Sequence, residues 1–373
     1  MTHTPPLKTS AAPAWDGLPM PRRLWAIVAV AFGVSLSVID GAIANVALPT
    51  IGRELGISEA DSIWIVNAYQ LAIMVSLLSF SALGDVVGYR KIYLGGLALF
   101  TLASVGCACS YSFATLVLTR VLQGFGAAAV TSVNTTLIRN IYPRAQLGRG
   151  MGINATVVAV SAVAGPTLAA AILSVASWPW LFAVNIPVGV TAFVLSRRYL
   201  PQNPVLVRDH RFDWRDGVLN ALTFGLLIAS IEGFSHGLDP RLIAFGVAAL
   251  LLIGFFFVRR QLREPYPILP FDLLRIPIFT VSVLTSICSF IAQMLALVAL
   301  PFYLQHACGY DEVETGLLMT AWPAIIMVVA PVAGYLVERI HAGLLGGMGL
   351  TAMCAGLLLL AFLPDNPPQG EII

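Results

Sequence analysis

The chain has 373 residues, of which 58% are hydrophobic and 11% are charged, whereas an ordinary soluble domain carries about 25% charged residues. Together with a mean hydropathy of +0.85, this composition excludes a water-soluble globule and indicates a polytopic membrane protein. The formal net charge is only +2, and the Lys and Arg residues fall in short clusters between apolar runs, which excludes the basic face of a nucleic-acid-binding protein.

Eleven apolar runs are long enough to cross a bilayer as helices, since a helix needs about 20 residues to span a ~30 Å hydrocarbon core. Residues 1–20 contain four prolines and no hydrophobic periodicity, and they are expected to form a disordered cytoplasmic tail. The sequence therefore predicts an all-α membrane protein. The predicted spans are residues 24–48, 62–83, 91–110, 113–137, 150–173, 179–198, 217–235, 241–259, 278–304, 315–337 and 341–363.

The positive charges lie almost entirely on one side of these spans. With the N-terminus on the inner side, 18 of the 21 Lys and Arg residues fall on that side, only Arg53 and Arg241 fall on the other, and Arg120 lies inside a span. Because cytoplasmic loops retain Lys and Arg, this bias predicts a cytoplasmic N-terminus.

Two charged side chains fall inside predicted spans, where a carboxylate costs several kcal/mol unless it is paired or neutralised. Asp40 lies 16 residues from the inner end of the first span, which is roughly 24 Å along a helix. Arg120 lies at a similar depth in the fourth span, with Gln123 on the same face at i+3. We expect Asp40 and Arg120 to face one cavity and to interact, so that Arg120 favours ionised Asp40 until a proton or cation competes. A purely structural ion pair is the alternative.

The predicted loop between the second and third spans combines a flexible residue with charges. Gly88 allows a tight reversal, and Asp85 can accept hydrogen bonds from a helix N-terminus. Arg90 and Lys91 would hold the loop on the cytoplasmic side. A related element recurs at 334–339, between the tenth and eleventh spans, which supports internal duplication.

Other candidate residues lie in the fifth and seventh spans. Gly165 and Pro166 together kink a helix, and the small residues around them permit close packing. Glu232 lies near the outer end of the seventh span, where an acid is cheap to keep, so a role in proton coupling competes with a simple interfacial position. Aromatic and amide side chains that could line a cavity for a flat organic cation, or simply pack, are Tyr69, Gln70, Gln293, Tyr303 and Trp322.

The sequence gives no support for an enzyme or a metal site. It contains no P-loop and no convergent set of nucleophile and base. The five cysteines lie mostly in apolar runs without flanking His, so neither a zinc site nor a disulfide framework follows from them. The sequence therefore does not predict a protein driven by nucleotide hydrolysis.

Taken in order along the chain, these motifs resemble those of the major facilitator superfamily, and within it the fourteen-span drug/proton antiporters that include quaternary ammonium and methyl viologen exporters. The resemblance departs from the family pattern at Ser81, Val86, Ala169-Ala170 and Pro179. The residues that carry it are Asp40, Asn45, Leu48 and Pro49 in the first span, Asp85, Gly88, Arg90 and Lys91 in the loop, Arg120, Gln123, Gly124 and Gly126 in the fourth span, and Gly165 and Pro166 in the fifth.

The resemblance implies a domain order. Residues 21–200 would form the N-terminal six-helix bundle, 201–265 an inserted two-helix hairpin, and 266–373 the first half of the C-terminal bundle. Three of the family's fourteen spans would then be absent, and the chain stops on Ile372 and Ile373 as if another span were about to begin. We therefore expect a truncated chain.

The resemblance also implies a function: a monomeric proton-coupled antiporter of the bacterial inner membrane that exports lipophilic cations such as quaternary ammonium compounds, dyes or methyl viologen, without a cofactor. In this hypothesis Asp40 takes up a periplasmic proton and releases the cation, and Arg120 tunes it. Asp85 and the Gly165-Pro166 pair would govern switching between outward-open and inward-open states. The alternatives are a non-transporting remnant or membrane scaffold, and a facilitator-type importer of a polar solute.

Overall fold

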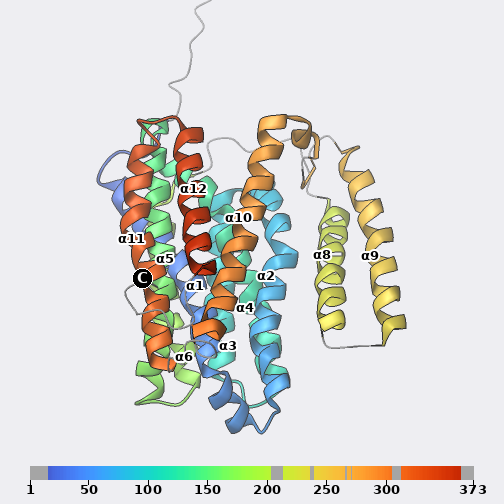
Figure 1. Cartoon of the computed structure of the whole chain (residues 1–373). Coiled ribbons are helices and arrows are strands. Elements are labelled where there is room, and N and C mark those ends of the chain that lie inside the picture. Colours follow the sequence, from blue (N-terminus) through green and yellow to red (C-terminus); the bar gives the residue numbers. More distant parts are fainter. Residues whose placement is uncertain are drawn as a thin grey trace, which may run out of the picture.

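The computed structural model describes residues 16–202, 213–235, 239–264, 267–269, 271–304 and 312–362. Within these ranges every regular element is a helix, and long helices run side by side to form a bundle (Figure 1). This confirms the all-α prediction for the described part of the chain.

The first half of the chain forms a compact group of helices with clear sequence signals at several ends. The Ser58 side chain caps the start of α2, and Ser112 forms a capping box with Thr115 at the start of α4. Gly56 ends α1 in the left-handed region, at φ 64°. The helices are α1 (Arg22–Leu55), α2 (Glu59–Val87), α3 (Tyr89–Ala108), α4 (Phe113–Ile141), η1 (Arg144–Gln146), α5 (Leu147–Leu173), α6 (Pro179–Ala183) and α7 (Asn185–Tyr199).

The second half of the chain adds a hairpin and three further helices. In Figure 1, α8 and α9 stand beside α2, and α11 lies against α5. In the apolar stretches of α10 and α12, no residue is buried by other described parts of the protein, as is typical of helix surfaces that face lipid. The elements are α8 (Trp214–Ser235), α9 (Pro240–Gln261), η2 (Phe271–Arg275), α10 (Pro277–Phe302), α11 (Glu312–Leu336) and α12 (Ala342–Ala361).

Each of the eleven predicted spans coincides with helical structure. Within the part of the chain that the structure describes, ten helical segments are long and apolar enough to cross a membrane, and α6 and α7 together form one of them. The span predicted at 315–337 coincides with α11, in which residues 324–336 form a shorter apolar helix. Helix α1 continues past the predicted end at residue 48, because Pro49 is accommodated inside it.

The predicted tail differs from the structure at its C-terminal end. Residues 1–15 lie outside the described residues, but residues 16–20 pack on the helices. Leu18 is buried in the main apolar cluster, and its backbone N–H donates to the carbonyl of Ile141 over 2.9 Å. An apolar side chain anchored in this way is not disordered, so the prediction for residues 16–20 is wrong.

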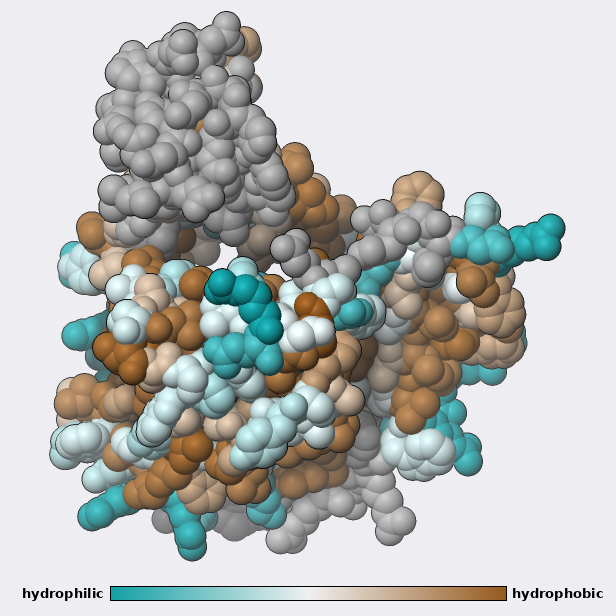
Figure 2. Space-filling model, turned by 90° about the horizontal axis from the view of Figure 1, so that it is seen from below, coloured by the Kyte–Doolittle hydropathy of each residue, from teal (hydrophilic) through white to brown (hydrophobic). Residues whose placement is uncertain are grey.

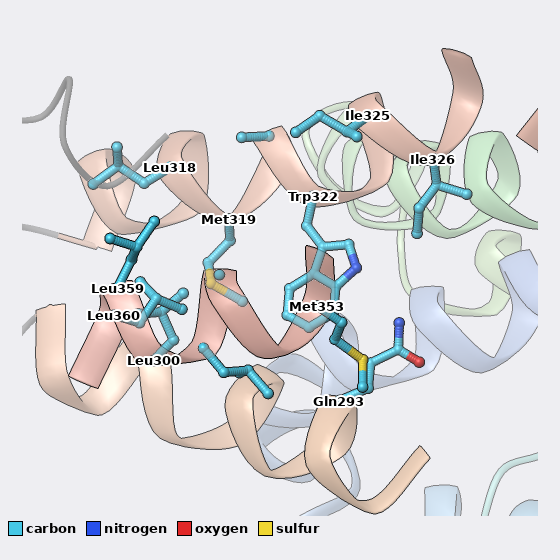
Figure 3. A pocket seen from close by; sticks show the side chains of 13 residues that line it. Gln293, Leu300, Leu318, Met319, Trp322, Ile325, Ile326, Met353, Leu359 and Leu360 are labelled. Atoms are coloured by element: carbon cyan, nitrogen blue, oxygen red, sulfur yellow. The ribbon is translucent and has the colours of Figure 1, made fainter. Parts of the chain in front are cut away.

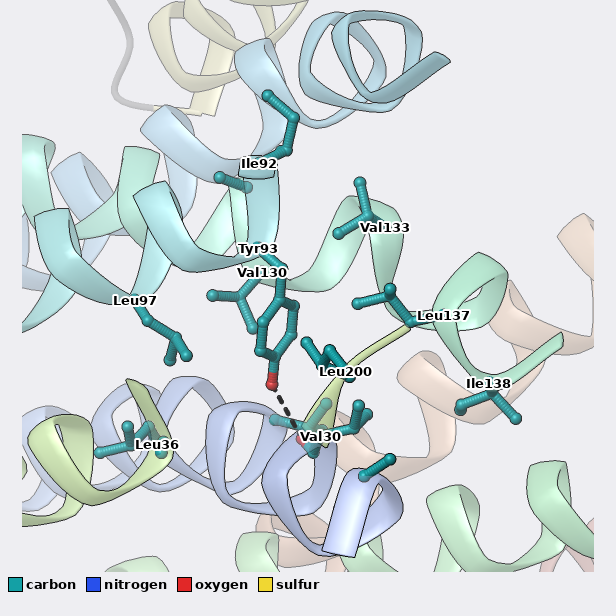
Figure 4. Close-up of a cluster of buried hydrophobic side chains, with 14 of the residues drawn as sticks. Val30, Leu36, Ile92, Tyr93, Leu97, Val130, Val133, Leu137, Ile138 and Leu200 are labelled. Atoms are coloured by element: carbon teal, nitrogen blue, oxygen red, sulfur yellow. Dashed lines mark hydrogen bonds between the residues drawn. The ribbon is translucent and has the colours of Figure 1, made fainter. Parts of the chain in front are cut away.

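The apolar core lies between α1, α3 and α4 (Figure 4). Tyr93 is fully buried there, and its hydroxyl donates to the carbonyl of Val30 over 3.2 Å. Close approach of α3 and α4 requires glycine, since a Cβ on Gly126 would lie 2.6 Å from the backbone nitrogen of Phe100. This packing fixes α4 against the other helices that carry the polar site.

Arginines gather at one end of the bundle. Arg22 donates to the carbonyl of Tyr199 over 3.2 Å, and Arg90 donates to the carbonyl of Arg197, so the start of α1, the loop after α2 and the end of α7 meet there. Figure 2 views the molecule from the opposite end, where brown hydrophobic residues cover much of the sides of the described helices. We call the first end the basic end; its arginines include Arg22, Arg23, Arg90, Arg149 and Arg197.

Candidate functional site

The carboxylate of Asp40 on α1 is the centre of a polar network in the interior of the bundle. Oδ2 accepts from Arg120 Nη1 over 2.5 Å. Oδ1 accepts from Gln123 Nε2 over 2.8 Å and from Asn185 Nδ2 over 2.7 Å. All three partners donate to Asp40, whose carboxylate oxygens act as the acceptors.

Helix geometry positions these groups. Arg120 and Gln123 are three residues apart on α4, so they share a face, and Arg120 Nη1 also donates to Gln123 Oε1 over 2.7 Å. Gln123 Nε2 in turn donates to Ser104 Oγ on α3 over 2.9 Å. Asn185 is the first residue of α7. The site therefore joins helices α1, α3, α4 and α7.

The Arg120 guanidinium is held on every side by protein. Nε donates to the carbonyl of Ile65 over 3.0 Å, and the guanidinium carbon lies 4.2 Å from the centre of the Tyr69 ring and 5.6 Å from that of Phe182. A buried cation is stable only with such partners, because its desolvation costs several kcal/mol. Helix α2 thus contributes a carbonyl and an aromatic ring to the same network.

The network is closed to solvent. Asp40 is 1% exposed, Arg120 and Gln123 are 0% exposed, and Asn185 is 2% exposed. The predicted interaction between Asp40 and Arg120 is present, and the structure holds both side chains away from solvent. Burial is complete because Tyr69 and Phe182 cover Arg120, and because Asn185 covers the second carboxylate oxygen.

Sequence reasoning missed Asn185 and Ser104 as members of the network. Asn185 stands in an apolar stretch, Leu181 to Ile186. A single amide in such a stretch is the sequence feature that could have indicated a functional polar residue. Ser104 carries a weaker signal, because serine in a helix usually bonds its own backbone, as its hydroxyl also does here with the Phe100 carbonyl over 2.8 Å.

Replacing Asn185 by leucine is expected to lower the free energy of unfolding by about 1.5 kcal/mol. Leucine has a similar volume but removes one donor from Asp40 Oδ1, in a site that is closed to solvent. The measurement is thermal unfolding in detergent. Asn67→Leu is the matched control, because Asn67 donates to the half-buried Glu232 instead, and it should cost less stability. An unchanged unfolding temperature in Asn185→Leu would contradict the prediction.

Glu232 is not part of the Asp40 network. It lies on α8, half-buried, and its Oε1 accepts from Asn67 Nδ2 on α2 over 2.9 Å. Asn67 lies between Ile65 and Tyr69 on α2, and these two residues contact Arg120. The same turns of α2 therefore contact both Arg120 and Glu232. The observed contact joins the α8–α9 hairpin to the first group of helices.

The loop motif connects α2 and α3 at the basic end. Gly88 has φ +112°, a conformation that favours glycine, and it forms the junction of the two helices. Asp85 accepts from the hydroxyl of Tyr89 in the first turn of α3. Arg90 binds the Arg197 carbonyl at the end of α7, and Lys91 is exposed. The motif therefore ties α2, α3 and α7 together.

Gly165 and Pro166 lie inside α5, which continues through both residues. A Cβ on Gly165 would lie 2.5 Å from the Cβ of Ala42 and 3.4 Å from the carbonyl oxygen of Ile39, so only glycine permits this approach of α5 to α1. These α1 residues flank Asp40. The glycine of the predicted kink thus lies directly beside the polar network.

The two halves of the chain meet most closely where α5 and α11 cross. A Cβ on Gly148 would lie 2.4 Å from the carbonyl oxygen of Gly334, and one on Gly152 would lie 2.8 Å from that of Ala330. Beyond α11, Glu338 Oε1 accepts from the backbone N–H of Arg149 in the first turn of α5 over 3.0 Å. The repeated element at 334–339 is thus part of a contact between the halves at the basic end.

A cavity of about 490 Å³ lies between α10, α11 and α12. Trp322, Met319 and Met353 project into it, and Gln293 supplies an amide at one edge (Figure 3). Its remaining lining is almost entirely aliphatic. Of the residues proposed to line a cation cavity, Gln293 and Trp322 are brought together here, whereas Tyr69 is buried at the Arg120 site.

Carboxylates also gather near the basic end, where α8 begins and α9 ends, in a group formed by Asp213, Asp216 and Glu264. Arg260 binds all three, with its Nη2 3.3 Å from Glu264 Oε1. An arginine at the centre of the group accounts for it as an ion network that fastens the two helix ends.

Known proteins that resemble the chain are membrane transporters. The uncharacterized transporter YebQ of Escherichia coli (strain K12) is 58% identical over 96% of this chain and 78% of that protein. Riboflavin transporter RibZ of Clostridioides difficile (strain 630) is 29% identical over 95% of this chain and 76% of that protein. The tetracenomycin C resistance and export protein of Streptomyces glaucescens is 33% identical over 94% of this chain and 65% of that protein.

The fold is also that of solved transporters. The crystal structure of the human organic anion transporter MFSD10 (TETRAN) superposes with a TM-score of 0.58 at 16% identity, over 91% of this chain and 77% of that chain. The family model described as Major Facilitator Superfamily matches residues 30–369. The motifs, the helical fold and these matches agree, and the chain belongs to the Major Facilitator Superfamily of membrane transporters.

Proposed function

We propose that the protein is a proton-coupled antiporter that exports lipophilic organic cations across the bacterial inner membrane. The observation that carries this proposal is the buried Asp40–Arg120 pair, a titratable acid inside the membrane that is held by donors from two other helices. Ionisable residues inside membrane spans mark ion and proton pathways by default. The relative named as a resistance and export protein supports the direction of transport.

Proton uptake at Asp40 has a structural consequence. Protonation turns one carboxyl oxygen into a hydroxyl, which accepts more weakly than a carboxylate oxygen and needs an acceptor for its own proton, whereas Arg120, Gln123 and Asn185 all meet Asp40 as donors. It also leaves the charge of Arg120 without a counter-charge in a site that is closed to water. Protonation therefore weakens the bonds of α1 to α4 and α7, which couples the proton to helix movement.

The cavity between α10, α11 and α12 supports the proposed class of cargo. Trp322 offers an aromatic face to a cation, and Met319 and Met353 are flexible apolar side chains that adapt to different shapes. In this proposal cargo binds there, while the proton binds at Asp40. The two ligands then influence each other through the helix contacts and need not share one carboxylate.

The orientation is proposed from the charges. Because cytoplasmic segments retain Lys and Arg, the basic end would face the cytoplasm and the opposite end the periplasm. Asp40 would then exchange protons with the periplasm, and the α5–α11 contact would close the cytoplasmic side. The transporter is proposed to act as a monomer on small lipophilic cations and protons.

A second candidate function is transport of a flat polar solute, which the relative named as a riboflavin transporter favours. A polar solute needs hydrogen-bond partners in its site, whereas the lining at Trp322 offers mainly Gln293. The two candidates therefore differ in the expected effect of Gln293→Leu, which would impair transport of a polar solute much more than transport of a lipophilic cation.

The test uses inside-out vesicles that contain the protein and carry an imposed proton gradient. Ethidium and methyl viologen serve as cations and riboflavin as the flat polar solute, with vesicles lacking the protein as control. We expect accumulation of the cations that collapses with the gradient. Gradient-driven movement of riboflavin alone would favour the second candidate, and movement of no substrate would favour a non-transporting scaffold.

A further inference from the structure

A groove between α1 and α5 opens at the basic end of the bundle. It has a volume of about 360 Å³ and is lined by α1 from Leu24 to Ala31 and by α5 from Arg149 to Val157. Most of this length is aliphatic, whereas Arg23, Tyr142, Gln146 and Arg149 stand at its mouth. The groove is thus apolar along its length and basic at one end.

The mouth of the groove carries two arginines, which could bind an anion. Arg23 is fixed by bonds from Nε to the Leu18 carbonyl over 2.8 Å and from Nη1 to Gln146 Oε1 over 2.8 Å. Burial raises the pKa of the Tyr142 hydroxyl above its ordinary value, and the charges of Arg149 and Arg23 oppose that rise, so both cations lie near this one hydroxyl. Among the described residues that line the groove, none is acidic.

The Arg149 side chain is available at this mouth. It is exposed, and no ion pair or hydrogen bond from its guanidinium is present within the described part of the chain. The acceptor on Glu338 is used by the Arg149 backbone N–H, and Asp16 is similarly used by the backbone N–H of Arg144. Both nearby acids therefore accept from backbone N–H groups, and neither forms an ion pair with the Arg149 guanidinium within the described residues.

The groove faces outward and not into the bundle. The inner side of α1 carries Val30 and Val34, which lie in the same buried apolar cluster as Val130 and Val133 of α4. The groove-lining Leu24 and Val28 lie on another side of α1, in a stripe that continues at i+4 to Phe32. Leu24 is 51% and Phe32 37% exposed. The apolar stripe is thus on the side of the helix pair that lipid would cover.

We propose that this groove is a binding site for an anionic phospholipid, with the phosphate held between Arg23 and Arg149 and one acyl chain lying along Leu24, Val28 and Ile153. From Leu24 to Ala31 the groove runs about 10 Å along α1, which is most of the ~15 Å depth of one leaflet of the hydrocarbon core. Basic residues at a membrane surface attract anionic headgroups, and the apolar stripe supplies the chain contact. The lipid would lie between α1 and α5, at the end of the bundle where α5 also contacts α11.

The test is native mass spectrometry of the detergent-purified full chain, titrated with phosphatidylglycerol, phosphatidylcholine or inorganic phosphate. We expect preferential retention of phosphatidylglycerol. Arg149→Gln should weaken it about fivefold, as expected for loss of one basic side chain. Val28→Trp, which fills the groove without changing charge, should weaken it as well. The control is Arg198→Gln, an exposed arginine at the same end but outside the groove, which should leave retention unchanged.

Four results would overturn the proposal. Equal losses in Arg149→Gln and Arg198→Gln would mean general surface charge and no site. Unchanged retention in both Arg149→Gln and Val28→Trp would place the lipid elsewhere. Retention of inorganic phosphate as strongly as of phosphatidylglycerol, or a dimer that Val28→Trp disrupts, would assign the groove to a different occupant. The measurement needs no transport, so it stands apart from the proposed cargo and proton coupling.

Discussion

An Asp40→Asn variant is expected to lose proton-driven efflux and to unfold more easily. The substitution keeps the shape of the side chain but removes the only carboxylate that pairs with Arg120 among the described residues. A buried charge left without its partner costs about 3–5 kcal/mol, because Arg120 is 0% exposed and has no water to solvate it. Thermal unfolding in detergent and dye efflux in cells that express the protein measure the two effects.

The double variant Asp40→Asn with Arg120→Gln separates structure from coupling. It removes both charges together, and the amides at Gln123 and Asn185 can still bond the new side chain at position 40. Most of the lost stability should return, since a neutral pair in the interior avoids the unpaired charge. Efflux should remain absent. If efflux returned with stability, Asp40 would be a structural acid and the proposed proton site would be wrong.

A Gly148→Val variant is expected to prevent α5 and α11 from closing at the basic end. A Cβ at this position would lie 2.4 Å from the carbonyl oxygen of Gly334, which is a backbone atom that cannot rotate away. Overpacking of this kind costs about 2 kcal/mol, which lowers the population of the closed arrangement about 30-fold. Transport should fall in proportion if alternation between closed and open states limits it.

Hydrogen exchange of the backbone amides in the first turns of α5 measures this opening, together with efflux of the same variant. Gly346→Val is the matched control, because a Cβ on Gly346 meets nothing within 4 Å. Faster exchange in Gly148→Val but not in the control would support the prediction. Unchanged exchange and efflux in Gly148→Val would show that this contact is not required for the transport cycle.

Much of the fold could be predicted from sequence because the bilayer constrains it. Only a helix satisfies its own backbone hydrogen bonds in lipid, so each apolar run of sufficient length predicts one helix. The sequence predicts the ends of the helices less well: α1 continues through Pro49, and residues 16–20 pack on the bundle. Hydropathy reports contact with lipid and does not report where a helix leaves the membrane.

The candidate site divides in the same way. The pairing of Asp40 with Arg120 could be predicted, because two opposite charges at one depth in hydrocarbon have few other partners. Asn185 and Ser104 could not, because an amide or hydroxyl in a helix has an inexpensive local alternative and gives a weak signal. Glu232 was grouped with Asp40 on charge alone, although it contacts Asn67 on α2.

The sequence by itself determined that the chain is a helical membrane protein, which residues carry buried charge, and which end is basic, because each follows from the cost of placing polar groups in lipid. The tertiary structure decided that Asp40 is closed off by three donors, that glycines bring α5 to α11, and that α1 and α5 leave a basic groove. Those features depend on distances between residues far apart in the chain. Such distances are set by the packing of whole helices, which no local pattern of residues encodes.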